Sequence, residues 1–230
     1  MTPPAIVARA RQVGLDLIAI ADHNSAGNVG AVKAAARGSG LEVLAGMEVE
    51  TREGVHVLCL FDESGPLGAL EQQVHAHLPL RENDPALFGP QPLLDEQGQV
   101  VGECTRLLLT AADLSLSQVC RAAADLGGLA IPSHVDRKAY GLLGVLGMLP
   151  ADLELAALEI SPRLTAQAAC RQYPSLRGKV LLGGSDAHRL EQMGQPHTLF
   201  RLQAPTVGEL RLALRGEQGR GCLGLEGGTA

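Results

Sequence analysis

Two histidine-acid clusters, near opposite ends of the chain, each follow an apolar run with the length and composition of a buried strand. His23 follows the run 15–21, and Asp186 and His188 follow the run 180–182. Side chains that follow parallel strands gather at one edge of a sheet or at one face of a barrel. Ligand-type residues placed repeatedly at strand ends therefore predict an α/β fold with a metal site at that edge.

Three further residues of ligand type, Glu48, His56 and His134, lie beside other short apolar runs. Each alone has an ordinary explanation, because a single histidine in an apolar run is usually a core residue and a single glutamate is usually exposed. Asp186 and His188 are two residues apart, so an extended backbone points both side chains to the same side. Ligand-type residues at five strand-linked positions are hard to explain as coincidence. Their chemistry suits Zn²⁺, Mn²⁺ and Fe²⁺ about equally.

Apolar runs and helix signals alternate along most of the chain, which predicts βα units around a mostly parallel sheet. Thr2 and Pro3 predict the start of a first helix, which Gly14 ends. The strands are expected at 15–21, 41–45, 55–61, 129–131, 155–160, 180–182 and 198–202, and the later helices at 26–37, 69–78, 116–126, 165–173 and 206–215.

The alternation is interrupted at about 62–110, which we interpret as an insertion or cap within a single domain at 1–215. Three prolines in the segment 83–92 predict a loop, and the segment 93–101 predicts a small hairpin. The Gly-rich end, 216–230, is expected to be a frayed, flexible tail.

Composition narrows the possible partners. The net charge of −6 argues against a broad basic surface, and an aromatic content of 2% argues against base stacking as a main binding mode. We therefore expect a small phosphorylated substrate or a nucleotide as partner, with no duplex nucleic acid and no membrane. The five cysteines form no Cys-x-x-Cys pair, and no apolar run is long enough to span a membrane, so a cytoplasmic protein is expected.

The remaining histidines carry weaker signals. His75 and His77 lie in a predicted helix, where positions two apart are about 200° apart around the axis and cannot share an ion. Both are expected to be surface residues, and His197 is unassigned.

The ordered series 21–24, 46–48, His56, 132–134 and 185–188 resembles the polymerase and histidinol phosphatase (PHP) family of metal-dependent phosphoesterases over most of the chain. The resemblance implies a distorted, TIM-like (β/α)7 barrel that holds up to three divalent cations. The metal-ligand positions of that pattern fall on His23, Glu48, His56, His134, Asp186 and His188.

One departure from the family pattern is large. Family members begin with a strand that carries a His-x-His pair, whereas this sequence has no histidine before His23. Either the coding start is set too late, with Met1 an internal methionine, or the metal site is impaired or completed by another chain. The first explanation is favoured, because loss of a barrel strand leaves neighbouring strands with unpaired backbone edges.

The function expected from the resemblance is hydrolysis of a phosphate ester by a metal-activated water, with one to three Mn, Zn, Fe or Mg ions. Arg137, followed by Lys138, is a candidate contact for phosphate, and Asp22 is a candidate to orient a neighbouring ligand. Two alternatives stay open. One is a nuclease that acts on short oligonucleotides, and the other is a catalytically weak regulatory or interaction domain on the same scaffold.

Overall fold

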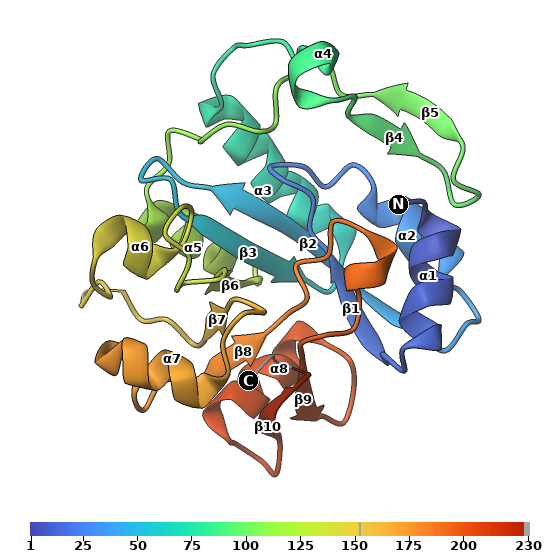
Figure 1. The fold of residues 1–230 in the computed structure, drawn as a ribbon. Coiled ribbons are helices and arrows are strands. Elements are labelled where there is room, and N and C mark those ends of the chain that lie inside the picture. The colour runs from blue at the N-terminus through green and yellow to red at the C-terminus, as the bar shows by residue number, and fades with distance from the viewer. Residues whose placement is uncertain (152, 228–230) are drawn as a thin grey trace.

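A four-stranded mixed sheet forms the centre of the molecule. The computed structural model describes residues 1–151 and 153–227. The sheet has the order β1-β2-β3-β6, in which β1 and β2 are parallel and both other pairs are antiparallel (Figure 1). Its strands are β1 (Leu17–Ile20), β2 (Glu42–Glu50), β3 (His56–Phe61) and β6 (Leu129–Pro132).

The direction of β3 corrects the prediction of a mostly parallel sheet. Only residues 51–55 separate β2 from β3, and Thr51 N–H donates to the carbonyl of Val55 at 2.9 Å to close the turn. A parallel connection needs a dozen or more residues, so this short link requires an antiparallel pair.

The remaining strands form three separate pairs, and no closed barrel is present within residues 1–151 and 153–227. An α/β fold is confirmed, whereas the complete (β/α)7 barrel is not. The pairs are β4 (Pro92–Leu94) with β5 (Val100–Glu103), β7 (Leu158–Ile160) with β8 (Leu181–Gly183), and β9 (His197–Arg201) with β10 (Gly221–Glu226).

The outer edge of β1 borders a large cavity. Within the described residues β1 pairs with β2 alone, and each of its four residues is half-buried. The cavity measures about 990 Å³ and is lined by β1 together with residues of β8 and β9. The interior of the fold is therefore open between β1 and β8.

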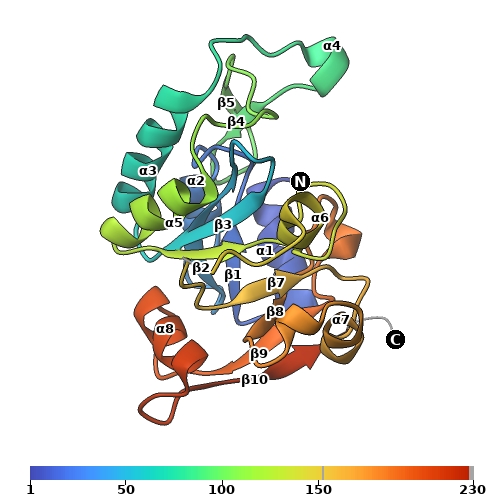
Figure 2. The same ribbon diagram turned by 90° about the vertical axis from the view of Figure 1, so that its left-hand side faces the viewer.

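Helices cover one face of the central sheet, whereas Leu44, Leu58, Leu60 and Ile131 on the opposite face line the cavity. Helices α3 and α5 pack against β2 and β3 on one face (Figure 2), where Phe61, Leu70 and Val119 are fully or almost fully buried. Helices α1 and α2 pack together near β2, around Ala10 and Val32. The helices are α1 (Pro3–Gln12), α2 (Val29–Ala35), α3 (Ser64–His77), α4 (Pro85–Phe88), α5 (Leu116–Asp125), α6 (Leu142–Leu146), α7 (Ala166–Gln172) and α8 (Val207–Arg215), with 3-10 turns at Pro174–Leu176 and Leu190–Gln192.

The interruption at 62–110 contains less inserted structure than we expected. Helix α3 packs into the core through Leu67, Leu70 and Val74, whereas α4 and the predicted hairpin β4–β5 project from the top of the molecule in Figure 1. The segment predicted to be a loop contains α4, where the Asp84 carboxylate accepts a hydrogen bond from Ala86 N–H at 3.0 Å.

The prediction of a flexible Gly-rich tail is wrong for residues 221–226. These residues form β10, and Arg220 donates two hydrogen bonds of 2.8 Å to the Glu209 carboxylate of α8. Gly216 and Gly219 have positive φ angles of 67° and 78°, which let the chain turn back onto β9. Residues 228–230 of that expected tail lie outside the described residues.

Candidate metal centre

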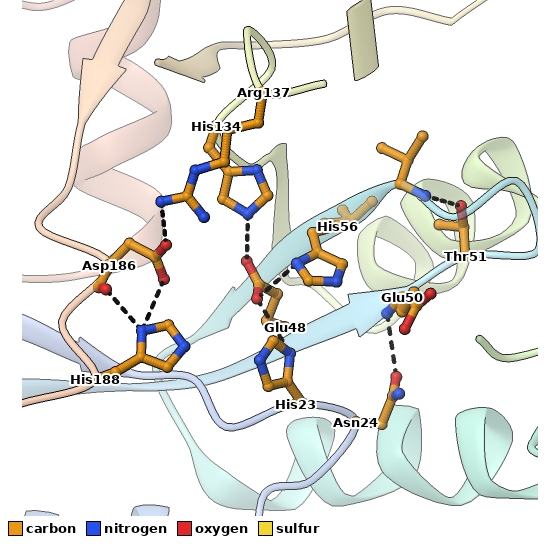
Figure 3. A network of polar contacts seen from close by, with 12 residues as sticks. His23, Asn24, Glu48, Glu50, Thr51, His56, His134, Arg137, Asp186 and His188 are labelled. Atoms are coloured by element: carbon orange, nitrogen blue, oxygen red, sulfur yellow. Dashed lines mark hydrogen bonds and ion pairs between the residues drawn. The ribbon is translucent and has the colours of Figure 1, made fainter. Parts of the chain in front are cut away.

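Four of the predicted ligands meet at one edge of the central sheet. Glu48 lies on β2, His56 begins β3, and His23 and His134 directly follow the ends of β1 and β6 (Figure 3). Because β3 is antiparallel to both β2 and β6, its first residue lies at the edge where those two strands finish. Strand direction thus explains why a histidine at the start of a strand joins residues at the ends of others.

Three imidazoles surround the carboxylate of Glu48. Oxygen Oε2 lies 3.1 Å from His56 Nδ1 and 3.3 Å from His23 Nδ1, and Oε1 lies 3.7 Å from His134 Nε2. His23, Glu48 and His56 each offer one ligand atom within 4.8 Å of the others. This spacing allows the three side chains to bind a common cation.

Burial and unpaired nitrogens support a cation at this position. Glu48, His56 and His134 are 8%, 7% and 1% exposed. His56 Nδ1 lies near the Glu48 carboxylate, and this buried nitrogen has no hydrogen-bond partner among the described residues. Native proteins rarely leave a buried nitrogen unpaired, and a cation between His56 and Glu48 would satisfy it. His134 Nδ1 is also buried without a hydrogen-bond partner among the described residues.

The protonation states suit cation binding. Burial lowers the pKa of both His23 and His134, which favours neutral imidazoles with a free lone pair. Burial alone would raise the pKa of Glu48, but contact with His56, aided by His23 and His134, lowers it to about 2. Near pH 7 the Glu48 carboxylate is therefore ionised, and the imidazoles of His23 and His134 are neutral.

Asp186 and His188 form a second, more exposed arm of the site. The Asp186 carboxylate lies 2.6 Å from Arg137 Nη2 and 3.8 Å from His188 Nδ1. The side chain of His188 is 64% exposed, and its ring centroid lies 6.2 Å from that of His23. The structure thus places all six predicted ligands in one region but in two arms, with His23 between them (Figure 3).

The turn that carries His23 is held by Asn24, which is completely buried at a φ of 50°. Its amide donates 2.9 Å hydrogen bonds to the carbonyls of Leu108 and Thr110, and its Oδ1 accepts from Glu50 N–H at 3.2 Å. The prediction that His75 is a simple surface residue is wrong, because its Nε2 makes a 2.8 Å contact with the carbonyl of Asn24. These bonds fix the direction of the neighbouring His23.

The two predicted catalytic residues have different surroundings. Arg137 lies in the site through its ion pair with Asp186. The carboxylate of Asp22 instead accepts a 3.1 Å hydrogen bond from Asn28, whereas its backbone carbonyl accepts from Glu48 N–H at 3.1 Å. Asp22 is therefore linked to Glu48 through its backbone carbonyl and not through its carboxylate.

Sequence reasoning missed two residues at the centre. Glu159, on β7, is buried beside the cavity. Burial, followed by the charges of Glu48 and Asp186, raises its pKa to about 8. An acid inside the apolar run 155–160 was the available signal. Tyr140 stacks on His56 with a centroid distance of 4.4 Å, and no local pattern marks it.

Residues 169–218, which include Asp186 and His188, match the family described as PHP-associated. The predicted resemblance to the PHP family is confirmed. The fold is similar to that of the lesion-specific endonuclease EndoQ from Pyrococcus furiosus, with a TM-score of 0.72 and 19% identity over 99% of this chain and 54% of that one. No curated protein matches the sequence.

Two further structures share this fold. Endonuclease Q in complex with a 27-mer duplex with an abasic lesion at the active site has a TM-score of 0.68 and 19% identity, over 96% of this chain and 53% of that one. A protein described as a metal-dependent phosphoesterase, from Bifidobacterium adolescentis, has a TM-score of 0.56 and 19% identity, over 86% and 85%. The PHP-like chain thus spans about half the length of the two endonuclease structures.

The expectation that duplex nucleic acid is not a partner is wrong. It depended on the net charge of −6 and on the low aromatic content. A structure of this fold holds duplex DNA at its active site, so those two properties do not exclude duplex substrates. The physical reason is that net charge is an average, whereas bound cations supply positive charge locally. As a separate finding, no helix in the described residues is long and apolar enough to span a bilayer.

Proposed function

We propose that this chain is a metal-dependent hydrolase of phosphate esters. The observation that carries the proposal is the set of three histidines around the buried Glu48 carboxylate, with an unpaired nitrogen on His56. Glu48 and His56, with His23 and His134 beside the two carboxylate oxygens, would hold one divalent cation. Asp186 and His188, together with His23 and Glu48, would hold one or two more. Carboxylate and imidazole ligands of this kind suit Zn²⁺, Mn²⁺, Fe²⁺ and, less well, Mg²⁺.

Divalent cations at such a site would neutralise the charge of a bound phosphate and lower the pKa of an attacking water. The buried side chains of Glu48, His56 and His134 are already fixed in position, so little ordering is needed when the reactants bind. The guanidinium of Arg137 lies at the exposed side of the site and would contact a phosphate oxygen. Asp22 contributes through its backbone bond to Glu48, which holds β1 and β2 in register.

A nuclease is the second candidate, and the similar folds favour it. The two highest TM-scores given above belong to an endonuclease specific for lesions, once free and once in complex with duplex DNA. The cavity of about 990 Å³ beside the metal centre leaves room next to the phosphate position. DNA, including duplex DNA with an abasic site, therefore belongs among the substrates to be tried.

The test measures hydrolysis of p-nitrophenyl phosphate, bis(p-nitrophenyl) phosphate, a single-stranded oligonucleotide and a duplex with one abasic site. Each assay is run with Mn²⁺, Zn²⁺ and Mg²⁺. We expect cation-dependent turnover of at least one substrate, and loss of that turnover in Glu48→Gln. Preference for the oligonucleotides would favour the nuclease. Loaded protein that hydrolyses none of the four would contradict both enzymatic proposals and favour a regulatory role.

A further inference from the structure

Tyr140 places an exposed aromatic ring beside the metal centre. The chain has two tyrosines, three phenylalanines and no tryptophan, so an aromatic ring at this position is notable. The ring stacks on His56 at a centroid distance of 4.4 Å and an interplanar angle of 20°. Tyr140 is nevertheless 46% exposed, so much of its ring stays open to solvent. A ring that served only to hold His56 in place would gain more stability if it were buried.

The loop that carries Tyr140 is tightly built. The carbonyl of Tyr140 accepts a 2.9 Å hydrogen bond from His56 N–H, which ties the loop to the first residue of β3. Tyr140 has a φ of 63°, an uncommon value for a bulky residue. A Cβ on Gly141 or Gly144 would clash with the carbonyl oxygen of Arg137, so the loop can pack this closely only with glycine at both positions. Strained backbone of this kind persists only where surrounding contacts hold it, and it is often found at ligand sites.

The same loop also carries positive charge. Arg137 reaches Asp186 across the mouth of the site, and Lys138 is exposed next to it. One short loop after His134 therefore presents a basic group that pairs with Asp186 and an aromatic ring that stacks on His56. This combination matches the two parts of a nucleotide, because phosphate binds basic groups and a base stacks on an aromatic face.

We propose that Tyr140 is a stacking platform for a nucleobase whose phosphate is held at the metal centre. The inference rests on the proposed phosphoesterase function and narrows its substrate class to nucleotides or to nucleic acid with an accessible, unpaired base. Stacking on a tyrosine accepts any base, since every base has a π-face, so this subsite selects for the presence of a base and not for its identity. His56 contacts Tyr140 through its ring face and Glu48 through Nδ1, so a single side chain connects the exposed ring to the proposed cation position.

The test compares two ligands that differ by a base. Binding of adenosine 5′-monophosphate and of ribose 5-phosphate to Mn²⁺-loaded protein is measured by calorimetry, under conditions that prevent turnover. We expect Tyr140→Leu to weaken binding of the nucleotide about tenfold and to leave ribose 5-phosphate within about twofold. Tyr140→Phe retains the ring and should bind both ligands almost as the unchanged protein does.

Tyr173→Phe is the matched control, because Tyr173 is the other tyrosine and its hydroxyl donates to the carbonyl of Asp136 at 3.2 Å. In that variant Tyr140 is the only tyrosine, so its fluorescence reports stacking directly. Addition of the nucleotide should quench this emission, after correction against free tyrosine amide, whereas ribose 5-phosphate should not.

Three results would overturn the proposal. Equal weakening of both ligands by Tyr140→Leu would show that the ring acts only through His56, and unchanged binding of both would show that it makes no contact. Failure of the unchanged protein to bind the nucleotide more tightly than ribose 5-phosphate would also contradict it. These results test the stacking site separately from the enzymatic proposal. Hydrolysis without a Tyr140-dependent preference for the nucleotide would contradict only the stacking site. Tyr140-dependent binding of the nucleotide without hydrolysis would contradict only the proposed enzymatic activity.

Discussion

The two arms of the metal centre differ in how the fold supports them. Glu48, His56 and His134 come from three adjacent strands of one sheet and are almost completely buried. Asp186 and His188 follow β8, which belongs to a separate strand pair, and the side chain of His188 is 64% exposed. A sheet fixes the relative positions of its strands through backbone hydrogen bonds, so the buried arm is preorganised. The exposed arm depends on looser packing across the open cavity.

The largest expected difference between the arms is in cation affinity. His134→Ala should abolish tight binding of at least one divalent cation, and Glu48→Gln should weaken binding by more than about 100-fold, because both remove a direct ligand of the buried arm. His188→Ala, in the exposed arm, should weaken binding by about tenfold or less. Isothermal titration with Zn²⁺ and Mn²⁺, together with metal analysis of the purified variants, measures these affinities.

His77→Ala is the control for chelation by surface histidines, since His77 is exposed on α3 and contacts the carbonyl of Gln73. Unchanged metal stoichiometry in His134→Ala would rule out this metal centre. Equal losses of cation affinity in Glu48→Gln and His188→Ala would show that the two arms contribute equally to cation binding, although the fold supports them differently.

A smaller effect is expected at Asn24, which fixes the turn between the two arms. Asn24→Ala removes one buried and two partly buried hydrogen bonds and leaves two carbonyls and one N–H without this partner. The expected loss is about 3 kcal/mol in the free energy of unfolding, measured by urea denaturation without metal. Cation affinity should also fall in this variant, because His23 follows the same turn.

Asn28→Ala serves as the comparison, because Asn28 also bonds to neighbouring loops but is only half-buried. Its substitution should cost less than about 1 kcal/mol. A similar small cost at Asn24 would show that the turn is held by packing and not by these hydrogen bonds.

The positions of the strands and the set of candidate ligands were predictable, because both follow from local sequence patterns. The pairing of the strands and the closure of the barrel were not predictable in this way. Apolar runs identify β1, β2 and β3, but hydrophobic periodicity does not determine strand direction. The five residues between Glu50 and His56 do carry that information, because so short a link cannot form a parallel crossover. A length argument would thus have predicted the antiparallel β2–β3 pair.

Other misses have different physical causes. The Gly-rich end was predicted from its composition to be a frayed, flexible tail, but its glycines form turns, and the ion pair between Glu209 of α8 and Arg220 anchors the start of β10. Tyr140 has no local signal, because its role depends on a tertiary contact with His56. Asp22 was expected to act through its carboxylate, and only the structure shows that this carboxylate bonds to Asn28.

The smallest predicted effect concerns Glu159, which is coupled to both arms through the charges of Glu48 and Asp186. Its pKa is raised from 4.5 to about 8 in the folded protein. Between these pH values the folded protein therefore keeps a proton that the unfolded chain has lost. The free energy of unfolding of the metal-free protein should then fall as the pH rises from about 4.5 to 8. Glu159→Gln cannot ionise and should remove this contribution, so the free energy of unfolding of this variant relative to the unchanged protein should increase as the pH rises towards 8.

Chemical denaturation in EDTA at pH 5, 6, 7 and 8 measures the effect, with Glu63→Gln as a matched acid-to-amide change at an exposed position. A difference between Glu159→Gln and the unchanged protein that stays constant over this range would mean that the pKa of Glu159 is not raised in the folded protein. With Mn²⁺ present the pH dependence should shrink, because cations bound at Glu48 and Asp186 offset the negative charges that keep Glu159 protonated.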